Sequence, residues 1–116
     1  MSKMVLVDAY LNLANPEAQE RANDILRDAL LNERSPEKRL KLVMLIVQRA
    51  QVPEHEEALG SLGAGPLEDM MSDWLLDRLQ DYLPFSESLR YALSMVRMEF
   101  EPEALQQRLN AMLAVR

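Results

Sequence analysis

The single histidine of this 116-residue chain, His55, lies among three glutamates in the segment PEHEE at residues 53–57. An imidazole among carboxylates is a combination that binds metal ions and that transfers protons in catalysis. A metal site on a helix, however, takes its ligands from positions three or four residues apart, because those positions share one face. The residues next to His55 would instead point in different directions around a helix. The pattern therefore indicates an exposed histidine and predicts no metal site.

Other catalytic chemistry has no better support in the sequence. Cysteine is absent, which excludes thiolate nucleophiles, disulfides and Cys-based zinc sites. Glu68 is the carboxylate best placed to be shielded, by Leu67 and Met71, but a position near a helix start explains it as a capping residue. No pattern pairs a general base with the serines of the central and C-terminal segments: Ser61, Ser72, Ser86, Ser88 and Ser94. We therefore predict that the protein is not an enzyme and uses no cofactor.

The segment GSLGAGPLED at residues 60–69 is rich in glycine, as phosphate-binding loops are. Such loops need either a lysine after the glycines or a strand before them, and this segment has neither. Glu68 and Asp69 would also repel an anion at the start of the next helix. The glycines instead predict positive φ angles in a tight turn, after which Pro66 begins a helix.

Aspartates recur every four residues along the helix that the sequence predicts over residues 66–82. They follow one side of that helix, away from the apolar stripe of Trp74, and we name them the acidic ridge: Asp69, Asp73, Asp77 and Asp81. Like charges at this spacing cost a helix about 0.2–0.5 kcal/mol per pair. Three explanations stay open: arginines of neighbouring helices offset the charges, the ridge is merely a solvated face, or it docks a basic partner.

If the ridge docks a partner, its charge speeds the encounter and a few apolar side chains hold the complex together. Leu76 is predicted to lie exposed beside the ridge and to serve as such an anchor. The predicted partner-binding residues are therefore Glu68, Asp69, Asp73, Leu76, Asp77 and Asp81.

Composition and periodicity predict helices throughout the chain. Leu, Ala and Met dominate the apolar residues, and aromatic residues make up only 5%. Asn15, Ser35 and Ser86 each stand where a side chain caps a helix start. The segment 36–50 is apolar on nearly every side and is predicted to be the central helix. In the helix before it, Glu20 and Arg27 are predicted to point away from the buried stripe. The expected helices span residues 2–13, 17–33, 36–50, 54–60, 66–82, 87–98 and 102–114.

These elements predict one all-α domain over residues 1–116, a compact bundle of six to seven helices. A HEAT-like fragment of an α-solenoid is the alternative arrangement.

Three segments resemble a bacterial helical domain family of unknown function: the apolar run at residues 42–50, GAGPLED at 63–69 and SLRYALSMV at 88–96. The family pattern is an apolar helix, then an A-G-P-L-E-D-L-L element, here GAGPLEDMM at 63–71, then a closing helix. The resemblance covers residues 40–98 and implies a fold rather than a reaction. Domains of this kind occur among small immunity-type and accessory proteins of bacteria, which favours a binding role.

The net charge of −6 predicts repulsion from phosphate backbones and anionic lipids, so neither nucleic acid nor a membrane is the expected partner. No apolar run approaches the length of a membrane span, and the N-terminus is not typical of a signal peptide, so the cytoplasm is the expected location. We predict a module that binds another protein with a basic surface, in its most concrete form an immunity-like inhibitor. The alternative is a structural or accessory subunit that forms a homodimer or larger assembly through an apolar helix face.

Overall fold

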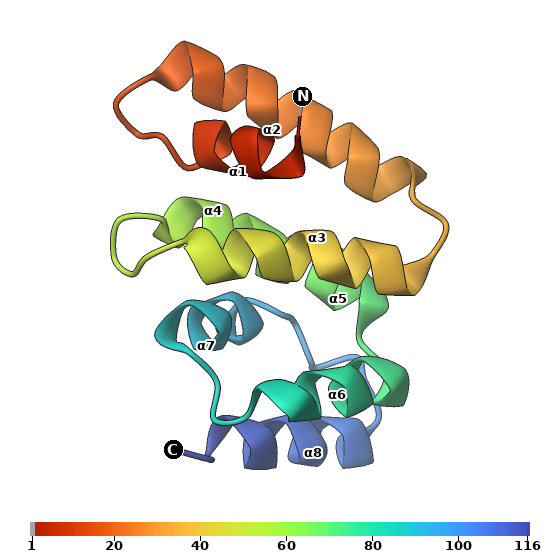
Figure 1. Cartoon of the computed structure of the whole chain (residues 1–116). Helices are drawn as coiled ribbons and strands as arrows, with labels where there is room; N and C mark the ends of the chain where they lie inside the picture. Colours follow the sequence, from red (N-terminus) through yellow and green to blue (C-terminus); the bar gives the residue numbers. More distant parts are fainter. Residues whose placement is uncertain (1) are drawn as a thin grey trace.

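The computed structural model describes residues 2–116, in which the regular elements are helices joined by turns and loops and no strand occurs (Figure 1). This confirms the predicted all-α bundle; since α5 is a single turn, the described chain has seven longer helices. The α-helices are α1 (Lys3–Tyr10), α2 (Pro16–Asn32), α3 (Pro36–Arg49), α4 (Glu56–Leu62), α5 (Glu68–Met70), α6 (Asp73–Leu79), α7 (Glu87–Ser94) and α8 (Glu103–Leu113). A π-helical turn, η1 (Gly63–Leu67), joins α4 to α5, and a 3₁₀ turn, η2 (Gln80–Tyr82), follows α6.

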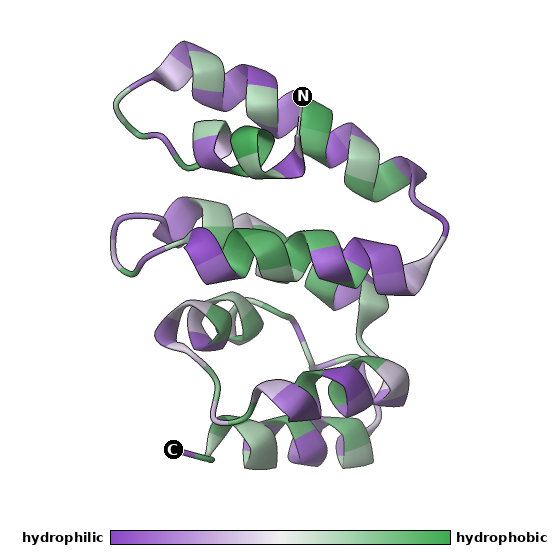
Figure 2. Cartoon of the chain, viewed as in Figure 1, coloured by the Kyte–Doolittle hydropathy of each residue, from purple (hydrophilic) through white to green (hydrophobic). Residues whose placement is uncertain are grey.

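The helices stack in layers, with α1 and α2 at one end, α3 and α4 in the middle, and α6 and α8 at the other end (Figure 1). Helix α1 packs on α2 and α3, α4 packs on α7, and α6 packs on α8. Six residues of α3 are buried, and hydrophobic residues run along its middle (Figure 2). Because α3 contacts both α1 and α7, the prediction of a central helix is confirmed.

Side-chain caps set the starts of three helices, as predicted. The Oδ1 atom of Asn15 accepts from the backbone N–H of Ala18 at 3.2 Å at the start of α2. Ser35 caps α3 and Ser86 caps α7 in the same way. Each cap satisfies an amide that has no partner within its own helix, which fixes the residue at which the helix begins.

The predicted break at the glycines is wrong. The chain runs from α4 through η1 into α5 as one helical rod, and none of its glycines has a positive φ. The break comes later, at Met71 and Ser72, where the Ser72 hydroxyl accepts from the backbone N–H of Leu75 at 3.2 Å and starts α6. The predicted helix over residues 66–82 is therefore divided into separate segments.

Gly63 is required by packing rather than by backbone conformation. A Cβ atom at this position would lie 1.9 Å from the carbonyl oxygen of Ala92 and 2.9 Å from the Cβ of Met95. The rod and α7 approach so closely here that no side chain fits. A Cβ at Gly65 meets nothing within 4 Å, so the two glycines of the same turn have different roles.

This difference predicts unequal outcomes for two matched substitutions. Gly63→Ala forces the rod away from the backbone of α7 and lowers the free energy of unfolding by about 1–3 kcal/mol or more. Gly65→Ala changes it by less than about 1 kcal/mol, because the better helix propensity of alanine is opposed by the ring of Pro66, which disfavours a helical residue with a Cβ before it. Urea unfolding of both variants measures the difference, and equal effects would contradict the packing role of Gly63.

Candidate functional site

The acidic ridge does not follow one helix. Asp69 lies on α5, Asp73 and Asp77 lie on α6, and Asp81 lies on η2. All four residues are exposed, but the break at Ser72 separates the first from the others. The predicted continuous row of four carboxylates on one helix is therefore wrong.

Two acids of the ridge are paired within the chain. The Nη1 atom of Arg108, on α8, donates to Oδ1 of Asp73 at 3.0 Å, and its Nη2 atom donates to Oδ1 of Asp77. These hydrogen bonds, that to Asp77 first, raise the pKa of Arg108. One guanidinium offsets half the charge of the two carboxylates and relieves their repulsion. Among the predicted explanations, an arginine of a neighbouring helix is therefore confirmed for this pair.

Leu76 is fully buried, with no exposed side-chain area, so its predicted exposure is also wrong. Helix α6 packs against α8, and its residues Leu75 and Leu79 are buried as completely as Leu76. Helix α6 is therefore covered on more than one side. The sequence pattern predicted only one buried face, the apolar stripe. In this structure Leu76 belongs to the core.

Glu68 joins two parts of the fold. Its Oε1 atom accepts from the backbone N–H of Arg97 at 2.7 Å and from the Nε of Arg97 at 3.4 Å. The backbone hydrogen bond is the main reason why the pKa of Glu68 lies below its ordinary value of 4.5; the Arg97 side chain also lowers it, and desolvation opposes the shift. The sequence predicted that Glu68 caps the start of its own helix. In the structure, Glu68 instead accepts from a backbone N–H in the segment that follows α7.

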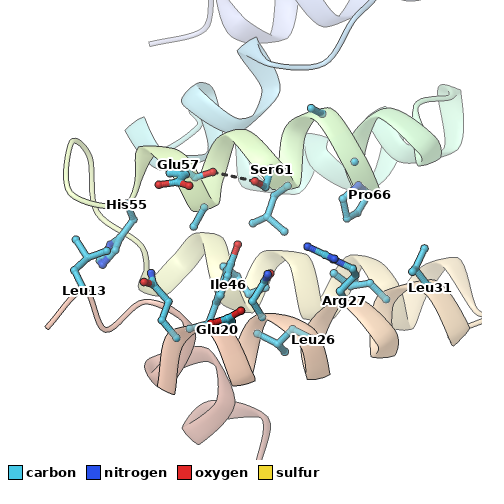
Figure 3. Close-up of a pocket in the computed structure, with 18 of the residues that line it drawn as sticks. Leu13, Glu20, Leu26, Arg27, Leu31, Ile46, His55, Glu57, Ser61 and Pro66 are labelled. Atoms are coloured by element: carbon cyan, nitrogen blue, oxygen red, sulfur yellow. Dashed lines mark hydrogen bonds between the residues drawn. The ribbon is translucent and has the colours of Figure 1, made fainter. Parts of the chain in front are cut away.

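A groove that sequence patterns did not predict lies between α2 and α4, and we name it the α2–α4 groove. Its volume is about 810 Å³, and residues of α2, α3, α4, η1 and α5 line it. Side chains of α2 and α4, among them Glu20, Arg27, Glu57 and Ser61, face one another across it (Figure 3). Its apolar lining consists of exposed Leu13 and Leu31 and partly exposed Leu30 and Pro66, above core residues such as Leu26 and Ile46 that are buried.

His55 lines one end of the groove and is not the exposed residue that the sequence indicated. Its Nδ1 atom accepts from the backbone N–H of Gln51 at 2.8 Å, so the proton is on Nε2, which lies 2.8 Å from the carbonyl oxygen of Leu11 and donates to it. The ring is neutral in this arrangement and ties the end of α1 to the loop before α4. Residues 2–116 contain no group of three or more His, Asp or Glu residues that could hold a metal ion.

The charged residues of the groove are of both signs. Glu57 lies near His55, whereas Arg27 lies toward the end marked by Pro66 and Leu31 (Figure 3). Arg39, at the start of α3, also lines the groove. Within residues 2–116, none of the charged groups of the groove forms an ion pair: Glu20, Glu54, Glu57, Asp69, Arg27 and Arg39.

Arg39 carries a buried hydrogen-bond donor that the described chain does not satisfy. Its Nε atom is inaccessible to solvent and has no acceptor. A buried donor without a partner costs about 1–3 kcal/mol, and more when it is charged. Tyr10 also lines the groove; burial raises its pKa above the usual 10.0, the charge of Glu57 raises it further, and the charge of Arg27 opposes the shift. Charges of both signs therefore act within this groove.

Sequence patterns missed the groove because its charged residues looked like an ordinary solvated face. Glu20 and Arg27 were predicted to point away from the buried stripe, and they do lie exposed. The groove forms because α2 and α4 face each other without packing extensively on each other (Figure 3). The seven-residue spacing of Glu20 and Arg27 was the available signal, because it places them on one face of α2.

Comparison with protein-family models, curated proteins and solved structures gives no significant match for this chain. The resemblance around GAGPLEDMM therefore stays a prediction. No helix in residues 2–116 is both long and apolar enough to cross a membrane.

Glu68→Gln is predicted to lower stability in a pH-dependent way. Because folding lowers the pKa of Glu68, its charge stabilises the fold fully above about pH 4.5, and this contribution is lost as the pH falls through the folded pKa. The thermal midpoint of Glu68→Gln should lie below wild type at pH 7 and converge with it in acid. Glu99→Gln, which removes an exposed acid without an ion pair, is the control. If the thermal midpoints of Glu68→Gln and wild type differed by the same amount at every pH, the stabilising role of the Glu68 charge would be contradicted.

Arg108→Met is predicted to lower the thermal midpoint, because it exposes Asp73 and Asp77 to their mutual repulsion and loosens α8 from α6. In a protein that already carries Asp73→Asn and Asp77→Asn, Arg108→Met should lower the thermal midpoint by a smaller amount. A double-mutant cycle at low salt measures this coupling. Strictly additive effects would show that the ion pairs contribute nothing.

Proposed function

We propose that this protein is a non-enzymatic module that binds another protein by receiving one of its helices in the α2–α4 groove. The observation that carries the proposal is the groove itself, which combines an apolar lining with unpaired charges at its rim. An amphipathic helix in an apolar groove is a recurring mode of protein recognition, in which side chains at helical spacing anchor in the lining.

The dimensions of the groove support a helical occupant. Lining residues on α2 extend from Pro16 to Leu31, which is about 22 Å along the helix axis. This length accommodates about four turns of a partner helix. The apolar residues of the lining supply the area that holds the complex, while the rim charges favour particular partners.

The net charge of −6 favours a partner with basic residues, and the acids at the His55 end of the groove are free to meet them. Asp73 and Asp77 of the acidic ridge are less suited to this role, because Arg108 already pairs with both. Glu68 is likewise paired with Arg97, so Asp69 and Asp81 stay as secondary contacts, and Asp69 also lines the groove. An immunity-like inhibitor that covers a basic partner surface is the most concrete form of this proposal. A chain without cysteine suits the reducing cytoplasm, where we expect the partner.

Selection from a library of helical peptides tests the proposal. Peptides that bind the wild-type protein should fail to bind Ser61→Trp, because the new indole fills the groove from the exposed face of α4. The control is Asn110→Trp, which adds the same bulk at an exposed position of α8 outside the groove. We expect Ser61→Trp to weaken binding at least about tenfold, or about 1.4 kcal/mol.

Equal binding to Ser61→Trp and Asn110→Trp, or a library that yields no helical binder, would overturn the assignment of the groove. Light scattering provides a second check. A wild-type dimer that Ser61→Trp converts to a monomer would assign the groove to a second copy of this chain, in agreement with the accessory-subunit alternative.

A further inference from the structure

Phe100 is the most exposed large hydrophobic side chain in residues 2–116, with 87% of its surface open to solvent. It lies in the segment between α7 and α8, where Glu99 and Glu101 are its neighbours in the chain. A single exposed aliphatic residue is ordinary, but an aromatic ring at this exposure leaves a large apolar area in water. The segment therefore presents an aromatic ring between two carboxylates.

Hydrogen bonds fix the turn that carries this ring, residues 98–101, which we name the Phe100 turn. The backbone N–H of Glu101 donates to the carbonyl oxygen of Met98 at 2.9 Å, and the Met98 side chain packs against the core. The Nε2 atom of Gln106, on α8, donates to the carbonyl oxygen of Glu101 at 2.8 Å. A turn that is already fixed loses little conformational freedom on binding, so the burial of its ring favours association more strongly.

A hollow of about 290 Å³ between α1, α3 and η2 has the complementary chemistry, and we name it the α3–η2 hollow. Lys3 and Lys41 line it, both are exposed, and neither forms an ion pair within residues 2–116. None of the described residues that line it is acidic. Half-buried Leu45, exposed Tyr82 and the aliphatic stems of the lysines supply its accessible apolar surface. Since a cavity of about 150 Å³ already binds benzene, the hollow is large enough for a phenyl ring.

We propose that the Phe100 turn of one copy of this chain inserts into the α3–η2 hollow of a second copy. The Phe100 ring then packs on Leu45 and on the ring of Tyr82, and aromatic rings pair favourably at such contacts. The two glutamates of the turn face the two lysines of the hollow. This local attraction specifies the contact in a protein whose net charge of −6 otherwise repels its own copies.

The contact joins two different surfaces of the same chain. It is reciprocal in a closed dimer and head-to-tail in a longer assembly. None of the residues of the Phe100 turn or of the α3–η2 hollow lines the α2–α4 groove. The inference therefore goes beyond the function proposed above and does not depend on it.

Sedimentation equilibrium of the full chain at about 0.15 M salt, which screens the net charges, measures this association. A contact with one aromatic anchor is smaller than a standard interface, so we expect a dissociation constant of about 0.1–1 mM. Phe100→Ser should weaken self-association at least about tenfold, because it removes the anchor. Lys41→Glu should do the same, because it places a third carboxylate against the two of the turn.

Two matched controls separate this contact from general effects of hydrophobicity and charge. Ile25→Ser removes another exposed hydrophobic side chain, and Lys38→Glu reverses another exposed lysine of α3. Neither position belongs to the Phe100 turn or lines the α3–η2 hollow. Both variants should associate as wild type does, and a loss of association equal to that of Phe100→Ser and Lys41→Glu would contradict the specific contact.

A mixture of the two disrupted variants provides the sharpest measurement, because each keeps one half of the contact. Phe100→Ser retains the hollow, and Lys41→Glu retains the turn. Their equimolar mixture should therefore form a complex that neither variant forms alone. Such a complex would also show that both variants are folded.

A wild-type protein that stays monomeric at about 1 mM would overturn this inference, and so would a mixture that does not associate. Both results would leave the α2–α4 groove untouched, because peptide binding there is measured separately. Self-association that Ser61→Trp abolishes and Phe100→Ser does not would place the contact between copies in the groove, and would also overturn the inference.

Discussion

The approach of Gly63 to the backbone of Ala92 is the contact on which the middle of this molecule depends. With 1.9 Å between an added Cβ and a carbonyl oxygen, no other residue fits there without moving α7 away from the rod formed by α4, η1 and α5. The contact fixes one side of that rod. Its other side, with Ala58, Ser61 and Pro66, then faces α2 across the groove. The same glycine therefore helps to build the core and positions one wall of the candidate site.

Two groups of charged residues in the protein have different physical roles. Those that join distant elements are paired: Asp8 with Arg49, Glu37 with Arg78, Glu68 with Arg97, and Asp73 and Asp77 with Arg108. Such exposed pairs contribute little individually, but they orient helices relative to one another. Those that line the α2–α4 groove are unpaired. An unpaired charge is available to a partner without first breaking a contact in the free protein.

Arg39 adds a cost to this arrangement that packing alone does not explain. A buried donor without an acceptor opposes folding, and buried polar groups in folded proteins nearly always have partners. Exceptions of this kind tend to occur at functional sites, where local stability is given up for binding. The apolar lining and the unpaired charges lie in one groove, and together they favour a binding role for the α2–α4 face.

The sequence by itself determined the helical class, the caps at Asn15, Ser35 and Ser86, and the burial of α3. These features depend on periodicity and on contacts within one helical turn, which local patterns encode. Only the tertiary structure decided that Gly63 serves packing, that Leu76 is covered by a second helix, and that Arg108 pairs with Asp77 across 31 positions of the chain. The groove depends in the same way on where α2 and α4 lie relative to α3. Such contacts follow from how helices pack, and one helix's pattern of apolar and charged residues does not specify which neighbour covers each face.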